Sequence, residues 1–280
     1  MLLSETWDKY RLDKTLEGFS PLTLKSYKYQ YQLLYDYLGD GEVNTITTDQ
    51  LKAYLVTSGS HLKPSSMGHK VRCVRSLFKW LYDEGIIHNN PATKLKEPKD
   101  GKRVPKFLSE TEIEYLREGC HSSLEKALFE FFYSTGCRIG EVVKLNREDI
   151  NFHTNTVIVH GKGNKEREVY FNIRCSLYLK RYLDEREDQE PCLFITERRP
   201  KKRMGTDIIR HIMKRISDRS VINKSIHPHQ LRHSYATHMI NNGAPIDVIQ
   251  SLLGHEKSET TKVYAQFSGK LRQHLYTKYF

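Results

Sequence analysis

The first hundred residues show apolar side chains three and four positions apart, which is the spacing of helices that bury one face. Ser20 is an N-cap residue followed by proline, and Gly39 is a typical helix stop, so these two residues bound one expected helix. A shorter helix is expected to begin at Thr48, and a longer one to run from Ser65 to Gly85. The pattern therefore predicts a small helical domain at the N-terminal end.

The pattern changes after a polar, proline-bounded stretch at residues 98–106, which is typical of an interdomain linker. Ser109 begins a capping box, and an apolar helix is expected before Gly136. Apolar and polar residues then alternate over residues 156–171 around a Gly-Lys-Gly-Asn turn, which predicts a β-hairpin. Further helices are expected at residues 173–187, 206–219, 228–242, 245–252 and 258–267.

Together these elements predict a mainly α-helical protein with a small β-sheet. We expect a helical domain at residues 1–97, a linker at 98–106, and a mixed α+β domain at 107–280 that includes a tail at 269–280. The length of 280 residues suits two domains of ordinary size. The tail carries an apolar stripe at helical spacing, so we expect it either to fold back on its own domain or to pack into a neighbouring copy.

The composition is that of an ordinary globular protein, with 38% hydrophobic and 28% charged residues. No apolar run approaches the roughly 18 residues that a membrane helix needs, and the first residues lack the pattern of a signal peptide. The five cysteines are scattered and form no C-x-x-C pair, which argues against a disulfide framework or a zinc site. We therefore expect a cytoplasmic protein with no membrane contact.

The charge is uneven along the chain. Lys and Arg number 45 against 34 Asp and Glu, for a net charge of +11. Residues 201–280 carry 14 basic and 5 acidic side chains, so this part alone contributes +9. A concentrated basic surface favours a polyanionic partner, with nucleic acid ahead of membrane, over a merely solvated face. Two groups are candidate DNA contacts: Lys70, Arg72, Arg75 and Lys79, and Arg198, Arg199, Lys201, Lys202 and Arg203.

Two polar clusters in the second domain lie at expected turns. Arg138 stands between two glycines at a helix start, and Glu141 three residues later is placed to orient it. Lys162 lies at the tip of the expected hairpin, where flanking glycines let the backbone approach a ligand closely. Taken alone, each also fits a structural role, as a helix-cap arginine or a solubilising turn lysine.

Two further clusters lie nearer the C-terminal end. His229 and Arg232 share one face of an expected helix, and a Leu-Gly-His motif at His255 precedes Tyr264. Four histidines lie close together here, but no carboxylate or thiolate accompanies them at the spacing of metal ligands, and His233 and His238 are expected to face a core. No H-E-x-x-H motif, phosphate-binding loop or G-x-S-x-G motif is present, so neither a metal nor a nucleotide cofactor is expected.

In chain order these clusters resemble the catalytic set of the tyrosine recombinase (phage integrase) family. The similarity covers essentially the whole chain and is greatest in layout to the short Xer-type and transposon-resolvase-type members. It implies that residues 1–97 bind core-site DNA and that residues 107–280 form the catalytic domain. The motifs are Arg138 in T-G-C-R-I-G-E, Lys162 in G-K-G-N-K-E-R, His229 and Arg232 in P-H-Q-L-R-H, His255 in L-L-G-H, and Tyr264 nine residues later.

The resemblance implies a site-specific recombinase that cleaves and rejoins DNA through a 3′-phosphotyrosine intermediate, in integration, excision or resolution of DNA. Such chemistry needs a nucleophile, charge neutralisation and proton transfer, and it needs no metal or ATP. The implied roles are nucleophile for Tyr264, phosphate binding for Arg138 and Arg232, general acid for Lys162, proton transfer for His229, donation to phosphate for His255, and support for Glu141.

Three alternatives remain at this stage. A type IB topoisomerase-like nicking-closing enzyme uses a similar site, a non-catalytic DNA-binding regulator would account for the charge, and a metal-dependent nuclease is the third. Recombination joins two duplexes, so the expected partners are double-stranded DNA with paired core sites and other copies of the chain, in dimers and tetramers. Accessory proteins or a paralogue are further candidate partners.

Overall fold

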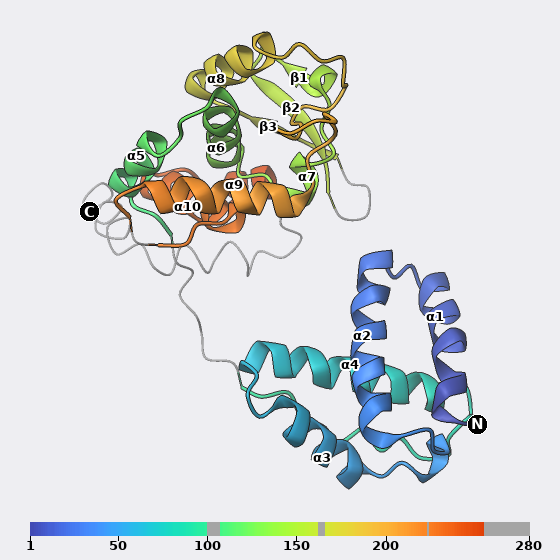
Figure 1. Cartoon of the computed structure of the whole chain (residues 1–280). Coiled ribbons are helices and arrows are strands. Elements are labelled where there is room, and N and C mark those ends of the chain that lie inside the picture. Colours follow the sequence, from blue (N-terminus) through green and yellow to red (C-terminus); the bar gives the residue numbers. More distant parts are fainter. Residues whose placement is uncertain (100–106, 162–165, 223, 255–280) are drawn as a thin grey trace, which may run out of the picture. The chain divides into compact units, whose positions relative to one another are not determined.

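The computed structural model describes residues 1–99, 107–161, 166–222 and 224–254 (Figure 1). The chain divides into two compact units, Met1–Lys102 and Arg103–Phe280. Among the residues described, no helix has the length and apolar character needed to cross a membrane. The predicted hairpin tip at 162–165, the expected helix at 258–267 and the tail at 269–280 lie outside the described residues.

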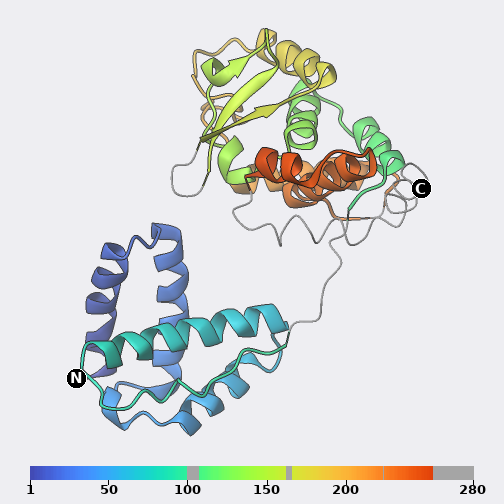
Figure 2. The ribbon, with the colours of Figure 1, turned by 180° about the vertical axis from the view of Figure 1, so that it is seen from behind.

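The N-terminal unit is helical, as its apolar spacing predicts. Helices α1 and α2 lie side by side, and α4 packs across α2 (Figures 1 and 2). Ser20 caps α2 by accepting a hydrogen bond from the Thr23 amide at 3.1 Å, and Gly39 ends this helix with a φ of 73°. The α-helices in residues 1–99 are α1 (Thr6–Leu16), α2 (Pro21–Leu38), α3 (Thr48–Gly59) and α4 (Pro64–Asp83).

The basic side chains of α4 divide between its two faces. Lys70 lies one turn before Val74 on the apolar face and is 2% exposed. Its ammonium donates to the Ser58 hydroxyl at 2.6 Å and lies 4.5 Å from the centre of the Tyr54 ring. The expectation that Lys70 contacts DNA is therefore wrong, because this side chain is buried and hydrogen-bonded inside the domain. Arg72, Arg75 and Lys79 are exposed on the opposite face.

The C-terminal unit is built around a small sheet and a central helix. Strands β1 (Ile150–Asn151), β2 (Thr156–His160) and β3 (Glu166–Tyr170) form an antiparallel sheet in that order. The predicted β2–β3 hairpin is confirmed, whereas the two-residue strand β1 was not anticipated. The helices are α5 (Glu110–Glu118), α6 (Ser123–Thr135), α7 (Ile139–Val142), α8 (Ile173–Asp184), α9 (Thr206–Arg219), α10 (Pro228–Asn241) and α11 (Ile246–Leu253).

Helix α6 is central to this unit and packs against both α8 and α10 (Figure 1). Phe129, Phe131 and Phe132 on successive faces are each at most 1% exposed, as expected for a helix surrounded by other elements. The same helix buries the carboxylates of Glu125 and Glu130. Because a buried charge is costly without partners, each of these acids should be paired with a cation.

Both acids have arginine partners. Arg117 of α5 pairs with Glu130, while Arg215 and Arg219 of α9 donate to Glu125 at 2.7 and 2.9 Å. Burial alone would raise the pKa of Glu125, but the His121 and Ser122 amides and the two arginines outweigh it, so that this pKa lies below its ordinary value. Arg215 and Arg219 therefore stabilise the α6–α9 contact.

We predict that Glu125→Gln lowers the free energy of unfolding of the C-terminal unit by about 2 kcal/mol at pH 7, since two arginines lose a buried partner but remain partly hydrated. Glu125 has a depressed pKa, so its contribution is present above the pKa of an unfolded glutamate and disappears as the pH falls through the lower folded value. Urea unfolding followed by far-UV circular dichroism at pH 7 and in the acid range measures both effects. The two tryptophans, Trp7 and Trp80, report the N-terminal unit separately.

A difference between wild type and Glu125→Gln that stays the same from pH 7 into the acid range would contradict this assignment. An unchanged tryptophan fluorescence transition serves as the internal control, because Glu125 lies outside the N-terminal unit.

Candidate active site

Arg138 is placed by a sharp turn between α6 and α7. Gly136 ends α6 in the left-handed region with a φ of 60°, and Arg138 is the N-cap residue of α7. A Cβ atom at Gly136 would lie 2.7 Å from Tyr235 and 3.1 Å from Leu253, so glycine is required both for the turn and for the close packing of α10 and α11. The glycine thus brings Arg138 next to the ends of two other helices.

Glu141 is the buried carboxylate that Arg138 contacts. Its side chain accepts from the Arg138 amide at 2.7 Å and from the Arg138 guanidinium at 2.9 Å. The contact expected from the three-residue spacing is therefore confirmed. Burial would raise the pKa of Glu141, but hydrogen bonds from Arg167 and Arg138 outweigh burial and hold the pKa below its ordinary value. Glu141 is consequently a permanent anion at neutral pH.

Arg167 is the residue of this cluster that sequence reasoning missed. It lies on β3 opposite Val159 and donates two parallel hydrogen bonds of 2.8 Å to the two carboxylate oxygens of Glu141. A signal was present in the alternation of β3, because Arg167 shares the inward face with the buried Val169. An arginine on the inner face of a strand needs an internal acceptor.

Arg232 reaches the same place from α10. It is 3% exposed, and its guanidinium donates to the carbonyls of Gly136 and Leu253, each at 2.6 Å. Burial and the nearby Arg138 lower the pKa of Arg232 to about 10, so it stays protonated at neutral pH. His229, three residues earlier on the same helix, is exposed, and its pKa is lowered by partial desolvation and by Arg232.

The three arginines meet at the C-terminal end of α11. Arg167 donates to the carbonyl of Leu252 at 2.9 Å, Arg232 to that of Leu253 at 2.6 Å, and Arg138 to that of Gly254 at 3.2 Å. These carbonyls carry the negative end of the helix dipole, and cations stabilise it. The structure thereby fixes the residue that immediately precedes His255.

The structure brings together three of the predicted site residues, Arg138, Glu141 and Arg232, and it places His229 on the same helix as Arg232. The other three predicted catalytic residues, Lys162, His255 and Tyr264, lie outside the described residues.

The histidines of α10 differ in their surroundings. His238 is 7% exposed, its Nε2 donates to the Leu108 carbonyl at 2.8 Å, and its Nδ1 accepts from the Tyr133 hydroxyl at 2.8 Å. Its predicted place in a core is confirmed. His233 is half-buried, and burial and nearby cationic groups lower its pKa to about 4. Within the described ranges, no group of three or more His, Cys, Asp or Glu side chains is arranged to hold a metal.

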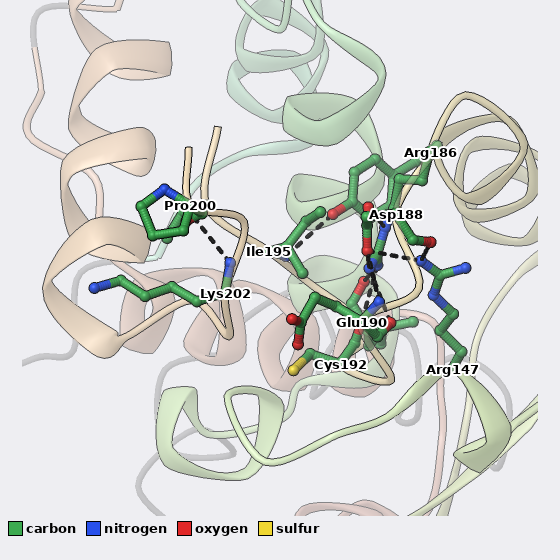
Figure 3. Close-up of polar contacts among 11 residues, drawn as sticks. Arg147, Arg186, Asp188, Glu190, Cys192, Ile195, Pro200 and Lys202 are labelled. Carbon is green, nitrogen blue, oxygen red and sulfur yellow. Dashed lines mark hydrogen bonds and ion pairs between the residues drawn. The ribbon is translucent and has the colours of Figure 1, made fainter. Parts of the chain in front are cut away.

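The second predicted DNA-contact group follows residues 192–195, where Cys192 and Ile195 form isolated β-bridges with Asn146 and Arg203. Arg203 is exposed and donates to the carbonyls of Val143 and Leu145 at 3.0 and 2.9 Å, so it closes the end of α7, while its role as a DNA contact stays a prediction. Lys202 extends away from the internal cluster of Arg147, Arg186 and Asp188 (Figure 3). The remaining members, Arg198, Arg199 and Lys202, are exposed, and Lys201 is half-buried.

Three guanidinium groups around one carboxylate leave an excess of positive charge at this site. Arg138 remains 36% exposed while two of its nitrogens donate to the protein, so it retains a face for an external anion. Paired guanidinium groups with fixed orientation match the oxygens of a phosphodiester. Fold and site therefore define a class of protein that binds phosphodiesters with pre-positioned arginines.

Comparison with known proteins identifies the family. Residues 102–270 match the model described as "Phage integrase family", and residues 12–85 match "Phage integrase, N-terminal SAM-like domain". The tyrosine recombinase XerC of Staphylococcus aureus (strain bovine RF122 / ET3-1) is 34% identical over 94% of this chain and 92% of its own length. The XerC of Oceanobacillus iheyensis is 32% identical over 92% of this chain and 90% of its own length.

Solved structures agree on the fold. A lambda integrase dimer bound to a COC′ core site matches with a TM-score of 0.76 at 19% identity, covering 93% of this chain and 97% of that one. XerH bound to a palindromic difH substrate matches with a TM-score of 0.77 at 19% identity, covering 94% of this chain and 82% of that one. The chain belongs to the phage integrase family, and it is a site-specific tyrosine recombinase that cleaves and rejoins DNA. The predicted family, fold class and activity are confirmed.

We predict that Arg232→Met costs more stability than Arg138→Met. Removing Arg232 leaves two buried carbonyls without this donor, at about 1–3 kcal/mol each, partly offset by relief of repulsion from Arg138. Arg138 is partly exposed, and water replaces most of what it loses. Urea unfolding of both variants at pH 7 compares them directly, and equal losses of stability would contradict the internal role of Arg232.

Proposed function

We propose that the phenol of Tyr264 attacks a DNA phosphodiester, forming the bond from phosphorus to the tyrosine oxygen and breaking the bond to the 5′ oxygen. The product is a 3′-phosphotyrosine and a free 5′ hydroxyl, and rejoining is the reverse step. The bond energy is retained, so no cofactor is needed. The observation that carries the proposal is the convergence of Arg138 and Arg232 beside the carboxylate of Glu141.

The arginines supply the electrostatic part of this reaction. The five-coordinate transition state bears more negative charge on its non-bridging oxygens than the ground state. Arg138 offers an exposed face, and Arg232 is held by two carbonyls of fixed position. Because both are already oriented before DNA binds, little reorganisation is needed when charge develops.

Two protons move in each cleavage, and both are handled by side chains of this chain. His229 has a lowered pKa and is therefore mostly neutral at neutral pH, which suits it to accept the phenolic proton. Lys162 is proposed to protonate the departing 5′ oxygen, and His255 to donate to a phosphate oxygen. The sequence motifs support these last two roles.

DNA binding is proposed to involve the exposed face of α4. Arg72, Arg75 and Lys79 follow one another at helical spacing on this face. Arg72 forms an ion pair with Glu97, and such an exposed pair is weak enough for a phosphate to replace it. In the C-terminal unit the exposed Arg198, Arg199 and Lys202, together with Lys201, are proposed to form a second contact.

The proposed assembly is a pair of protomers on each core site and a tetramer joining two duplexes. The solved relatives bound to a core site as a dimer and to a palindromic substrate support this proposal. Residues 269–280, which carry the apolar stripe, are proposed to connect neighbouring protomers. A DNA substrate and five buried, unpaired cysteines support a cytoplasmic enzyme.

We predict that Tyr264→Phe abolishes the covalent protein–DNA adduct and leaves DNA affinity nearly unchanged, because the substitution removes the nucleophile and no phosphate contact. A pool of randomised duplexes with a nick beside the cleavage region is incubated with wild-type protein, and the strands captured covalently are sequenced to identify the site. The recovered duplex is then used with the variant. Tyr170→Phe, which changes an exposed tyrosine of β3, is the matched control and should form the adduct normally.

An adduct that persists in Tyr264→Phe would make another residue the nucleophile. Failure of wild-type protein to capture any strand would overturn the proposed chemistry as a whole.

We predict that Arg75→Ala with Lys79→Ala makes the dependence of binding on salt shallower by about two phosphate equivalents, each about 0.9 in the slope of log K against log salt. Lys70→Met should leave this slope unchanged, since Lys70 is internal. Binding of the recovered duplex at several salt concentrations measures the slopes, and tryptophan fluorescence verifies that each variant is folded. An altered slope for Lys70→Met, or an unaltered one for the double variant, would refute this arrangement.

A further inference from the structure

Arg167 differs from Arg138, whose side chain is 36% exposed, in having no exposed face left for a ligand. Its side chain is 12% exposed. All three guanidinium nitrogens donate to the protein, two to Glu141 at 2.8 Å and Nε to the Leu252 carbonyl at 2.9 Å. A phosphate would have to displace a two-point ion pair to reach it. Arg167 therefore has a different task from Arg138.

We propose that Arg167 is a positioning residue for DNA cleavage, which holds Glu141 and the end of α11 in place and thereby orients Arg138 and the chain that leads to His255. This inference rests on the proposed cleavage chemistry and adds to it a residue outside the predicted catalytic set. Three elements meet at one guanidinium, since Arg167 belongs to β3, Glu141 to α7 and Leu252 to α11.

Arg167 is needed because Arg138 has two anionic partners, the carboxylate of Glu141 and the DNA phosphate. Glu141 is buried, and a buried carboxylate needs full compensation. Arg138 contributes to that compensation, but it must also turn a face to the DNA phosphate, which competes with Glu141 for the same guanidinium. Arg167 supplies a second cation that never binds phosphate. Glu141 thus remains an anion and continues to accept from the Arg138 amide and side chain.

Arginine is required at this position because three acceptors lie around one planar group. The fork satisfies both oxygens of Glu141, and Nε satisfies the Leu252 carbonyl. A lysine in the same place supplies a single mobile ammonium, which cannot hold all three with fixed geometry. Arg167→Lys should therefore recover only part of the function.

A second buried pair in the same unit provides a matched control. Arg117 of α5 pairs with Glu130 of α6, whose side chain is 1% exposed, and the Arg117 side chain is 18% exposed. Among the described residues, Arg117 contacts Glu114, Glu130 and the Tyr133 ring, all of which lie outside the arginine cluster. Arg117→Met therefore disturbs stability in a comparable way without touching Glu141.

The experiment measures single-turnover formation of the covalent adduct on the duplex recovered by wild-type protein. Arg167→Met should react about 100-fold more slowly, the size of effect expected when a reacting group is misplaced by about 1 Å. Arg167→Lys should lie between this variant and wild type, and Arg117→Met should keep the wild-type rate. Arg167→Met added to Glu141→Gln should cause little further loss, since both act on Arg138 through one contact.

The pH profile separates positioning from general destabilisation. In the part of the chain that the structure describes, the charged and titratable groups around Glu141 are Cys137, Arg138, Arg167 and Arg232, and among these five groups only Glu141 titrates in the acid range. Loss of Arg167 raises the pKa of Glu141, so the fall of the rate on the acid side should move to higher pH in Arg167→Met. Arg117→Met should not move it, and Glu141→Gln should retain only the fall caused by protonation of His229, the proposed proton acceptor.

The proposal is overturned if Arg167→Met reacts like Arg117→Met at every pH, or if its effect multiplies with that of Glu141→Gln. Should Arg167→Met fail to fold by circular dichroism, Arg167→Lys is compared with Arg117→Lys, and equal rates in that pair overturn it likewise. A wild-type protein that forms no adduct would instead refute the cleavage chemistry, so the two failures are distinguishable.

Discussion

The buried carboxylate of Glu141 is the interaction on which the rest of the catalytic unit depends. It sits between guanidinium groups from α7 and β3, and those groups in turn hold the carbonyls at the end of α11. Without an anion there, Arg138, Arg167 and Arg232 would repel one another in a medium of low dielectric constant. The Glu141 carboxylate and the carbonyls at the end of α11 therefore offset the repulsion among the three arginines. The site keeps a net positive charge, which attracts a phosphate.

Buried glutamates paired with arginines also occur away from the site, where they stabilise the fold. Glu125 and Glu130 lie inside α6 and are compensated by arginines from α9 and α5. In this basic protein a substantial share of the positive charge is thus used internally. The net charge of +11 indicates a polyanionic partner, but it does not identify which side chains meet DNA. Lys70 shows this, since it lies in a basic segment and yet is buried and donates to the Ser58 hydroxyl.

In the proposed chemistry, the charge that stabilises the transition state belongs to side chains whose hydrogen bonds are made before the substrate arrives. The unfavourable free energy of bringing these like charges together is compensated when the domain folds. This explains why so many backbone carbonyls, at Gly136 and at Leu252 to Gly254, face guanidinium groups.

Local signals determined a large part of this protein. The caps at Ser20 and Ser109, the stop at Gly136 and the alternation of the hairpin depend on neighbouring residues only, so they could be read from the sequence. The contact from Arg138 to Glu141 was predictable for the same reason, because it spans three residues. Lys70 lies one helical turn before Val74, so its place on the apolar side of α4 could also be predicted from the sequence.

Only the tertiary structure decided what those inward-facing cations meet. Lys70 finds an acceptor 12 residues away on α3, and Arg167 finds its acid 26 residues away on α7. Arg232 meets carbonyls contributed by two separate helix ends. A side chain's direction follows from the period of its own helix or strand, whereas its partner depends on which other elements pack against that face. That packing is a property of the whole domain, and it places Arg167 of β3 against the carboxylate of Glu141.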